Sequence, residues 1–315
     1  MAVTVPTVFI TSATGSQGSA LCRQLRGLGW RVRATTRDPS SPTAQALQAI
    51  GVEFVVGDWD SEEALRDGLA GCSKLFLCLL PNLRDFEQAP ARAQRIVRIA
   101  REVGVEQAVA STTLGAFMLE EGKEPPIEPT GFFREHLKSK KRVEQAVVDG
   151  GFAHWTLLRP AFFMANFIEP KIQFGYTETR DKGSWTNCMG PKAPLGLVDH
   201  VDIARFAAAA FQDPDTFDGR HIGVASEELL VQDAMDQLSG AIGDGRAIQA
   251  KFASDEEISR LRSEGSWLFF CTEPCVRYMS DYLDMKLLKS LVPELTTFKQ
   301  FLERETEAVQ QTYLA

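Results

Sequence analysis

A loop of small residues follows the first apolar run of the chain and has the layout of a phosphate-binding turn. The run at 8–10 leads into this loop, and a helical pattern continues from 19 to 28. In dinucleotide-binding βα turns, backbone N–H groups and a helix N-terminus meet a pyrophosphate, and glycines allow the backbone to approach closely. Ser12 stands where the first glycine is usual, so the glycine signature is incomplete. We predict cofactor contacts from these residues of the turn: Thr11, Ser12, Thr14, Gly15, Ser16, Gln17 and Gly18.

Arg37 follows the second apolar run, at the place where such folds distinguish NAD from NADP. An acidic residue there accepts hydrogen bonds from the ribose hydroxyls, whereas a guanidinium suits a 2′-phosphate. Asp38 leaves two interpretations open, a contact with the ribose or the cap of the next turn. We therefore predict NADP(H) as the cofactor.

The third apolar run ends in a second acidic and aromatic segment. Asp58 is expected to reach the adenine edge of the cofactor, and Trp59 is assigned to the same site. Asp60 or Ser61, rather than Asp58, is expected to cap the following helix.

His136 and Lys140 lie four residues apart, so a helix would present both on one face. A histidine near its ordinary pKa can donate a proton at neutral pH, and an alkoxide formed by hydride transfer to a carbonyl needs such an acid. Lys138 and Lys141 are predicted on other faces of this helix. The alternative is that His136 is a polar residue near a helix start and that Lys140 only anchors a ribose.

Three hydroxyl side chains follow the fifth predicted strand. Ser111, Thr112 and Thr113 would lie at the carboxyl edge of a parallel sheet, where they could direct a hydroxyl toward substrate. Capping or turn formation is an equal alternative for them. Ser111 and Thr112 therefore join His136 and Lys140 as candidate catalytic residues.

The elements that must position these residues alternate between strand and helix. We predict strands at 7–11, 31–35, 53–56, 74–79, 107–110 and 154–158, and helices near 17–28, 42–50, 61–70, 86–103 and 132–149. Short strands that are apolar throughout are typical of a parallel sheet covered on both faces. The pattern predicts an α/β, Rossmann-type doubly wound parallel sheet.

The alternation ends after Pro160. We predict a cofactor-binding domain at 1–160 and a smaller, mostly helical substrate-binding lobe at 161–315, with elements that can return to the sheet. Within this lobe we expect a helix at 199–211, a strand near 220–224, helices near 230–240 and 254–263, and several helices in 272–310. Residues 122–131 are expected to form a loop.

Composition narrows the classes of partner. The 315 residues carry a net charge of −8 and 44% hydrophobic residues, which argues against direct nucleic-acid binding. No apolar run is long enough for a membrane span. Six scattered cysteines complete no zinc site and indicate free thiols in a reducing cytosol, so we expect a cytoplasmic protein without a metal.

The motifs together resemble the NmrA-like family of atypical short-chain dehydrogenases/reductases. The likeness extends over almost the whole chain, and it is carried by the turn at 11–18 and by the following segments: Thr36-Arg37-Asp38-Pro39, Gly57-Asp58-Trp59-Asp60, His136-x-x-x-Lys140-x-x-Val143-Glu144, Leu158-Arg159-Pro160-Ala161-Phe162-Phe163-Met164-x-Asn166, Gly196-Leu197-Val198-Asp199-x-x-Asp202-Ile203 and Asp218-Gly219-Arg220-His221-Ile222.

This resemblance implies an NAD(P)-binding Rossmann domain, a small C-terminal lobe and a ligand cleft between them. Typical members of the wider superfamily carry Tyr-x-x-x-Lys, in which the lysine lowers the tyrosine pKa and holds the nicotinamide ribose. Here His136 takes the place of the tyrosine. Leu79, Pro160 and Phe163 complete our predicted set of cofactor contacts.

The family contains reductases, enzymes of fungal natural-product pathways and redox-responsive regulators, which leaves two functions open. We favour an NADP(H)-dependent oxidoreductase acting on a bulky hydrophobic carbonyl or iminium compound, with or without net redox change. The alternative is a non-catalytic NAD(P) sensor that binds a protein partner. Aromatic residues in the predicted cleft segments favour a hydrophobic small-molecule substrate: Phe132, Phe133, Phe162, Phe163, Phe167, Trp185, Trp267, Phe269 and Phe270.

Overall fold

The computed structural model describes residues 5–129, 131–264 and 276–314, and the chain forms two compact units. The first unit contains 1–116, 135–159 and 203–222, and the second contains 117–134, 160–202 and 223–315. One crossing between them, after Arg159, falls at the predicted boundary near residue 160. The segment 203–222 then returns to the first unit.

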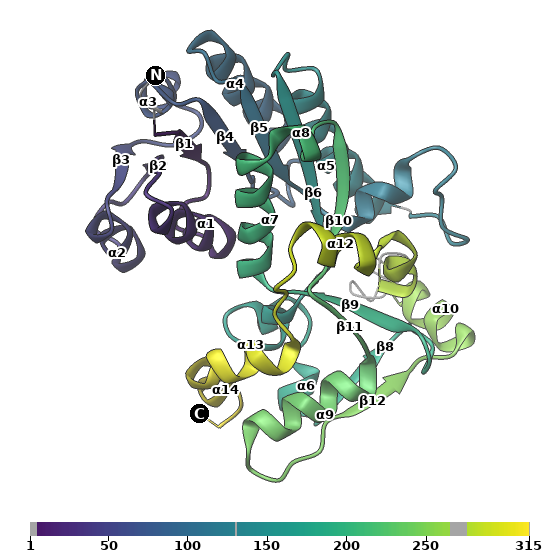
Figure 1. The fold of residues 1–315 in the computed structure, drawn as a ribbon. Helices are drawn as coiled ribbons and strands as arrows, with labels where there is room; N and C mark the ends of the chain where they lie inside the picture. Colours follow the sequence, from purple (N-terminus) through teal and green to yellow (C-terminus); the bar gives the residue numbers. More distant parts are fainter. Residues whose placement is uncertain (1–4, 130, 265–275, 315) are drawn as a thin grey trace. The chain divides into compact units, whose positions relative to one another are not determined.

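The first unit is built on a seven-stranded sheet in the order β10-β6-β5-β4-β1-β2-β3 (Figure 1). Its strands are β1 (Thr7–Ile10), β2 (Arg31–Thr36), β3 (Val52–Val56), β4 (Lys74–Leu77), β5 (Gln107–Ser111), β6 (His154–Pro160) and β10 (Arg220–Val224). The pairings among β1 to β6 are all parallel. In this order β1 lies between β2 and β4, so the loops that follow these three strands meet at one edge of the sheet.

Helices connect the strands and cover the sheet. They are α1 (Ser16–Gly27), α2 (Pro42–Ala49), α3 (Glu62–Leu69), α4 (Gln88–Glu102), α5 (Gly131–Val148), α7 (His200–Gln212) and α8 (Pro214–Phe217). One core layer joins Phe9 and Leu75 of the sheet to Leu65 of α3, Ile96 of α4 and Val143 of α5. These positions are apolar because alternate strand residues and one stripe of each helix point into this layer.

The opposite face of the sheet is covered by α7. The Gln107 Nε2 of β5 donates to the Ala210 carbonyl of α7 at 2.6 Å, and Lys74 Nζ of β4 lies 5.8 Å from the Phe211 ring centre. Helices on both faces bury the central strands β1, β4 and β5, whereas the edge strand β3 is partly exposed.

The second unit combines two small sheets with helices. One sheet has the order β11-β9-β7, formed by Glu227–Leu230, Pro194–Val198 and Phe162–Phe163; the other pairs β12 (Gln249–Phe252) with β8 (Ser184–Asn187). The longer helices are α9 (Val231–Ile242), α10 (Asp255–Ser263), α12 (Met285–Leu291), α13 (Phe298–Arg304) and α14 (Thr306–Tyr313). Shorter helical segments are η1 (Leu114–Leu119), η2 (Met164–Phe167), η3 (Lys171–Phe174), α6 (Glu178–Asp181) and η4 (Met279–Tyr282).

The predicted strands and helices of the Rossmann-type fold are confirmed to within a few residues. The predicted strand near 220–224 is β10, which extends the main sheet. The short strands at 162–163, 184–187, 194–198, 227–230 and 249–252 were not predicted, because none shows a clear alternation of apolar and polar residues.

The described residues were compared with the requirements for a membrane span and for a metal site. Within 5–129, 131–264 and 276–314, no helix is long and apolar enough to cross a membrane. The same ranges contain no cluster of three or more side chains that could hold a metal ion.

Candidate nucleotide-binding site

The loop between β1 and α1 takes its shape from two of its residues. Ser12 has a φ of +50°, a conformation that favours glycine and that costs another residue about 1–2 kcal/mol. Its hydroxyl donates to the Cys78 carbonyl at 2.8 Å, which holds this loop against the end of β4. A Cβ on Gly18 would lie 2.1 Å from the Ser12 carbonyl oxygen, so only glycine lets α1 pack this closely on the loop.

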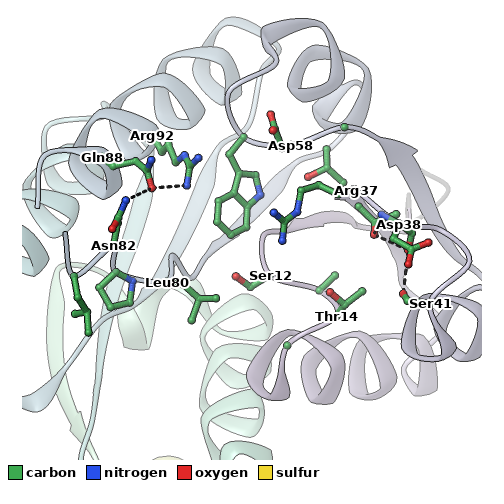
Figure 2. A pocket seen from close by; sticks show the side chains of 18 of the residues that line it. Ser12, Thr14, Arg37, Asp38, Ser41, Asp58, Leu80, Asn82, Gln88 and Arg92 are labelled. Atoms are coloured by element: carbon green, nitrogen blue, oxygen red, sulfur yellow. Dashed lines mark hydrogen bonds between the residues drawn. The ribbon is translucent and has the colours of Figure 1, made fainter. Parts of the chain in front are cut away.

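A pocket of about 660 Å³ opens beside this loop in the first unit. Its lining comes from the segments that follow β1, β2, β3 and β4, together with the start of α4 (Figure 2). Six of the predicted cofactor residues line it: Ser12, Thr14, Gly15, Arg37, Asp58 and Trp59. The sheet order brings these distant segments together, as the Rossmann arrangement requires.

Arg37 supplies an available positive charge to this pocket. Its guanidinium projects into the pocket in Figure 2 and has no hydrogen bond or ion pair with any residue that the structure describes. Asp38, in contrast, is engaged in a turn, where its Oδ1 accepts from the Ser40 N–H at 2.9 Å and from the Ser40 hydroxyl. These bonds lower the pKa of Asp38. Of the two interpretations of Asp38, the structure thus supports the turn.

Asp58 and Ser61 have different structural roles after the end of β3: Asp58 stabilises a turn and Ser61 caps a helix. The Asp58 carboxylate accepts from the Asp60 and Ser61 N–H groups at 2.9 and 3.2 Å, while the Ser61 hydroxyl caps α3 by accepting from the Ala64 N–H. The predicted cap at Ser61 is confirmed. Asp60 instead pairs with arginines of α4, and its hydrogen bond to Arg92 is the main reason its pKa is lowered.

Other predicted residues of the turn lie outside the pocket lining and stabilise the loop and its neighbours. Thr11 is fully buried, and its hydroxyl bonds the backbone of Phe76 and Cys78, which ties β1 to β4. Gln17 accepts the Ser111 hydroxyl at 2.7 Å. Ser16, half-buried, opens α1. None of these three, nor Gly18, lines the pocket.

Lys140 reaches the same edge of the sheet from α5. Its side chain is 9% exposed, and its Nζ donates to the Leu79 carbonyl at 3.0 Å. Burial lowers the pKa of this lysine. Lys138, by contrast, is exposed and pairs with Glu135, so it lies on another face of α5, as predicted. Leu79 itself is buried and offers its backbone to Lys140.

His136 differs from the expectation that it titrates near neutrality. Burial, with a smaller contribution from the Lys140 charge, lowers the pKa of His136 to about 4. At pH 7 only about one molecule in a thousand would carry the imidazolium form. The structure therefore does not support an ordinary pKa for His136, and the role of this residue as an acid stays a prediction.

The predicted hydroxyls at the end of β5 are engaged within the first unit. Ser111 donates to Gln17, and Thr112 donates to Glu144 Oε1 at 2.6 Å. Glu144 also receives two hydrogen bonds from Arg159, at 2.9 and 2.7 Å. Thr112 thus belongs to a buried ionic network. Thr113 is half-buried.

Several predicted contacts belong to the second unit. Pro160 ends β6, and Phe163 of β7 is half-buried with Lys171 Nζ 4.7 Å from its ring centre. Phe162, Phe167 and Trp185 pack on one another and are almost fully buried. These three form core, which corrects their assignment to a substrate surface, while Trp267, Phe269 and Phe270 lie outside the described residues.

The segment after β4 was missed by the sequence analysis, although it supplies one side of the pocket. It contributes Leu80, Pro81, Asn82, Leu83 and Arg84. Leu80 is 73% exposed and Leu83 is 44% exposed. The position of β4 next to β1 could have indicated this segment, because the strands on either side of the switch point line the ligand site.

Ser12→Gly should leave affinity for NADPH unchanged or improve it. The substitution removes the strain of the positive φ, but it also removes a hydrogen bond of about 1 kcal/mol to Cys78. These effects on stability nearly cancel, and Gly15 and Gly18 keep the close approach. Measurement of the Kd for NADPH checks this, with Gly18→Ala as the matched control that should weaken binding. A large loss in Ser12→Gly would show that the hydroxyl itself contacts the cofactor.

Comparison with known proteins agrees with this geometry. The profile of the NmrA-like family matches residues 4–260. An NAD(P)H azoreductase from Xenophilus azovorans is 27% identical over 237 residues, 75% of this chain and 74% of that protein. Two solved structures share the fold. NmrA, a negative transcriptional regulator in complex with NADP, has a TM-score of 0.71 at 18% identity, with 98% of this chain and 97% of that chain covered. The triphenylmethane reductase of Citrobacter sp., complexed with NADP(H), has a TM-score of 0.70 at 19% identity, with 94% and 99% covered.

The fold, the phosphate-type loop and the family match lead to one assignment. This chain belongs to the NmrA-like family.

Proposed function

We propose that this protein is an NADP(H)-dependent reductase that acts on a bulky, hydrophobic carbonyl, iminium or similarly conjugated electrophile. The assignment of NADP(H) as cofactor rests on Arg37. Its guanidinium faces a nucleotide-sized pocket and has no partner among the described residues. The azoreductase and the triphenylmethane reductase among its relatives and neighbours support the reaction class. Both of their names denote reduction of extended conjugated molecules.

The residues of the pocket fit the adenosine half of NADP(H), from its pyrophosphate to its 2′-phosphate. The backbone of the Ser12–Gly15 loop lines the pocket, where N–H groups ahead of α1 can meet a pyrophosphate. Arg37 pairs with the 2′-phosphate, since no carboxylate competes for it. When bound, the nicotinamide supplies the hydride.

Lys140 is the residue best placed to serve the chemical step. A buried cation whose pKa is lowered stabilises developing negative charge and gives up a proton more readily than an ordinary lysine. His136, neutral at pH 7, donates a hydrogen bond instead of a full proton. If the imidazolium of His136 were the acid, turnover would rise steadily as the pH falls from 7 toward 4.

Arg37→Ala should weaken NADPH binding about tenfold or more, because a charged hydrogen-bond pair contributes roughly 1.5–3 kcal/mol. Affinity for NADH should change little, since NADH lacks the 2′-phosphate. Calorimetric Kd values for both cofactors check this in wild type and variant. Arg31→Ala is the matched control, because Arg31 begins β2, the strand that Arg37 follows, but pairs with Glu53. Equal wild-type affinities for NADPH and NADH would contradict the assignment.

A panel assay tests the reaction itself. NADPH oxidation is measured with hydrophobic carbonyls, quinones, azo dyes and triphenylmethane dyes, and products are analysed by mass and chirality with deuterated NADPH present. The second analysis detects a redox-neutral enzyme, whose cofactor returns to its starting state in each cycle. A nucleotide-sensing regulator, the function that the NmrA neighbour represents, would bind NADPH and turn over none of these compounds.

A further inference from the structure

The loop between β4 and α4 is held at both ends by neighbouring residues of α5. At its start, Lys140 Nζ donates to the Leu79 carbonyl at 3.0 Å. At its end, the Ser139 hydroxyl donates to the Phe86 carbonyl at 2.7 Å. Because Ser139 and Lys140 are consecutive residues, both ends of the loop lie near one turn of α5, an arrangement typical of compact surface loops that carry function.

Phe86 is the main point of attachment at the second end of the loop. Its ring meets the His136 ring edge-on, with ring centres 6.2 Å apart and an interplanar angle of 63°. The next residue, Glu87, accepts two hydrogen bonds from the Arg142 guanidinium, one of them at 2.6 Å. This end of the loop is therefore held to α5 through a ring and an ion pair as well as a hydroxyl.

Residues 80–84, between the two attachments, form one wall of the pocket. Asn82 braces this stretch from within. Its Oδ1 accepts from the Arg84 N–H at 3.0 Å, and its Nδ2 donates to Gln88 Oε1 at 3.4 Å (Figure 2). A loop braced in this way moves as a unit, so the position of the wall depends on how its ends are held.

We propose that His136 and Ser139 are positioning residues, which hold Phe86 and thereby set the distance between the wall at 80–84 and a nucleotide in the pocket. This inference rests on the proposed function, in which the pocket binds NADP(H). Neither residue is among the described residues that line the pocket, so both act on the nucleotide through the loop. A gap of about 0.5–1 Å already loses roughly a quarter to a half of a van der Waals contact, so a small shift of the wall lowers affinity.

The arrangement gives His136 a role that needs no change in its charge. Burial lowers the pKa of His136 to about 4, so its ring packs on Phe86 in the neutral form at pH 7. Lys140, the residue proposed for the chemical step, lies one turn further along α5 and holds the other end of the same loop. One turn of α5 thus connects the pocket wall with the proposed site of proton transfer.

His136 is tested through its ring. His136→Ala removes the contact with Phe86 and should weaken NADPH binding about two- to tenfold, the range of an aromatic pair. His136→Phe keeps a ring at this position and should recover most of the affinity, although it has no proton to donate. Calorimetric Kd values for NADPH measure both effects. Equal losses in the two variants would overturn the inference, because the imidazole itself would then be required.

Ser139 is tested by binding and by proteolysis. Ser139→Ala removes the hydroxyl that holds the Phe86 carbonyl and should weaken NADPH binding about two- to tenfold. Arg84 is exposed in the loop, and the rate at which trypsin cleaves after it follows the local opening of the loop. Ser139→Ala should raise this rate by a similar factor in the absence of nucleotide, and NADPH should lower it.

Lys138→Met is the matched control on the same turn of α5, because Lys138 is exposed and pairs with Glu135. It should change neither the Kd for NADPH nor the cleavage after Arg84. A merely structural role of Ser139 and His136 would contradict the inference: the midpoint of urea unfolding would fall, while NADPH affinity and the cleavage rate after Arg84 would stay at their wild-type values.

The outcomes separate this inference from the proposed function. Tight NADPH binding that is unchanged in His136→Ala and in Ser139→Ala would overturn the positioning role and leave the function intact. Failure of the wild type to bind NADPH would overturn the proposed function itself.

Discussion

Lys140→Met should lower turnover by about 10²–10⁴-fold, the range expected when a group that transfers or stabilises a proton is removed. It should also weaken NADPH binding, because Lys140 is the cation proposed to hold the nicotinamide ribose. The stability of the protein should stay the same or increase. Lys140 is buried and donates a hydrogen bond to the Leu79 carbonyl, and a buried ammonium costs free energy that methionine avoids.

This combination of lower activity and undiminished stability distinguishes a functional lysine from a structural one. The measurements are turnover with a substrate found in the panel assay, the Kd for NADPH and the unfolding midpoint in urea. Lys138→Met is the matched control on the same helix, since Lys138 is exposed and pairs with Glu135 on the surface. Unchanged turnover in Lys140→Met would remove this lysine from the mechanism.

Glu144→Ala should destabilise the protein by about 3–5 kcal/mol, the cost of leaving a buried charge without its partner. Glu144 and Arg159 are 2% and 0% exposed, and two hydrogen bonds join them. The same carboxylate accepts the Thr112 hydroxyl. Its removal leaves the Arg159 guanidinium without its carboxylate where α5, β5 and β6 meet.

Urea unfolding measures this effect, and a double variant tests its cause. Glu144→Leu combined with Arg159→Met removes both charges and should recover most of the lost stability, because well-packed apolar residues can replace a buried ion pair. Glu135→Ala, an exposed carboxylate of the same helix, should change stability by less than about 0.5 kcal/mol. A double variant as unstable as Glu144→Ala would show that shape, and not charge, is decisive here.

The sequence by itself determined the main sheet and predicted candidate cofactor residues in the segments after its first three strands. Short apolar runs that alternate with amphipathic stretches admit few arrangements other than a doubly wound sheet. Ser12, Arg37 and Trp59 each lie within three residues of the end of a strand, so their place at the carboxyl edge depends only on local chain order. The helical repeat likewise separated Lys140 from Lys138.

Only the tertiary structure decided which chemistry each of the other residues can perform. The exposed segment 80–84 joins the site because β4 pairs with β1, a contact that no local pattern specifies. Burial lowers the pKa of His136. The Thr112 hydroxyl donates its hydrogen bond to Glu144, a residue 32 positions away in the chain. The aromatic residues Phe162, Phe167 and Trp185 become core for the same reason, since burial depends on residues distant in the chain. Composition and spacing therefore identify candidate residues, while packing determines their charge, their partners and their access to a ligand.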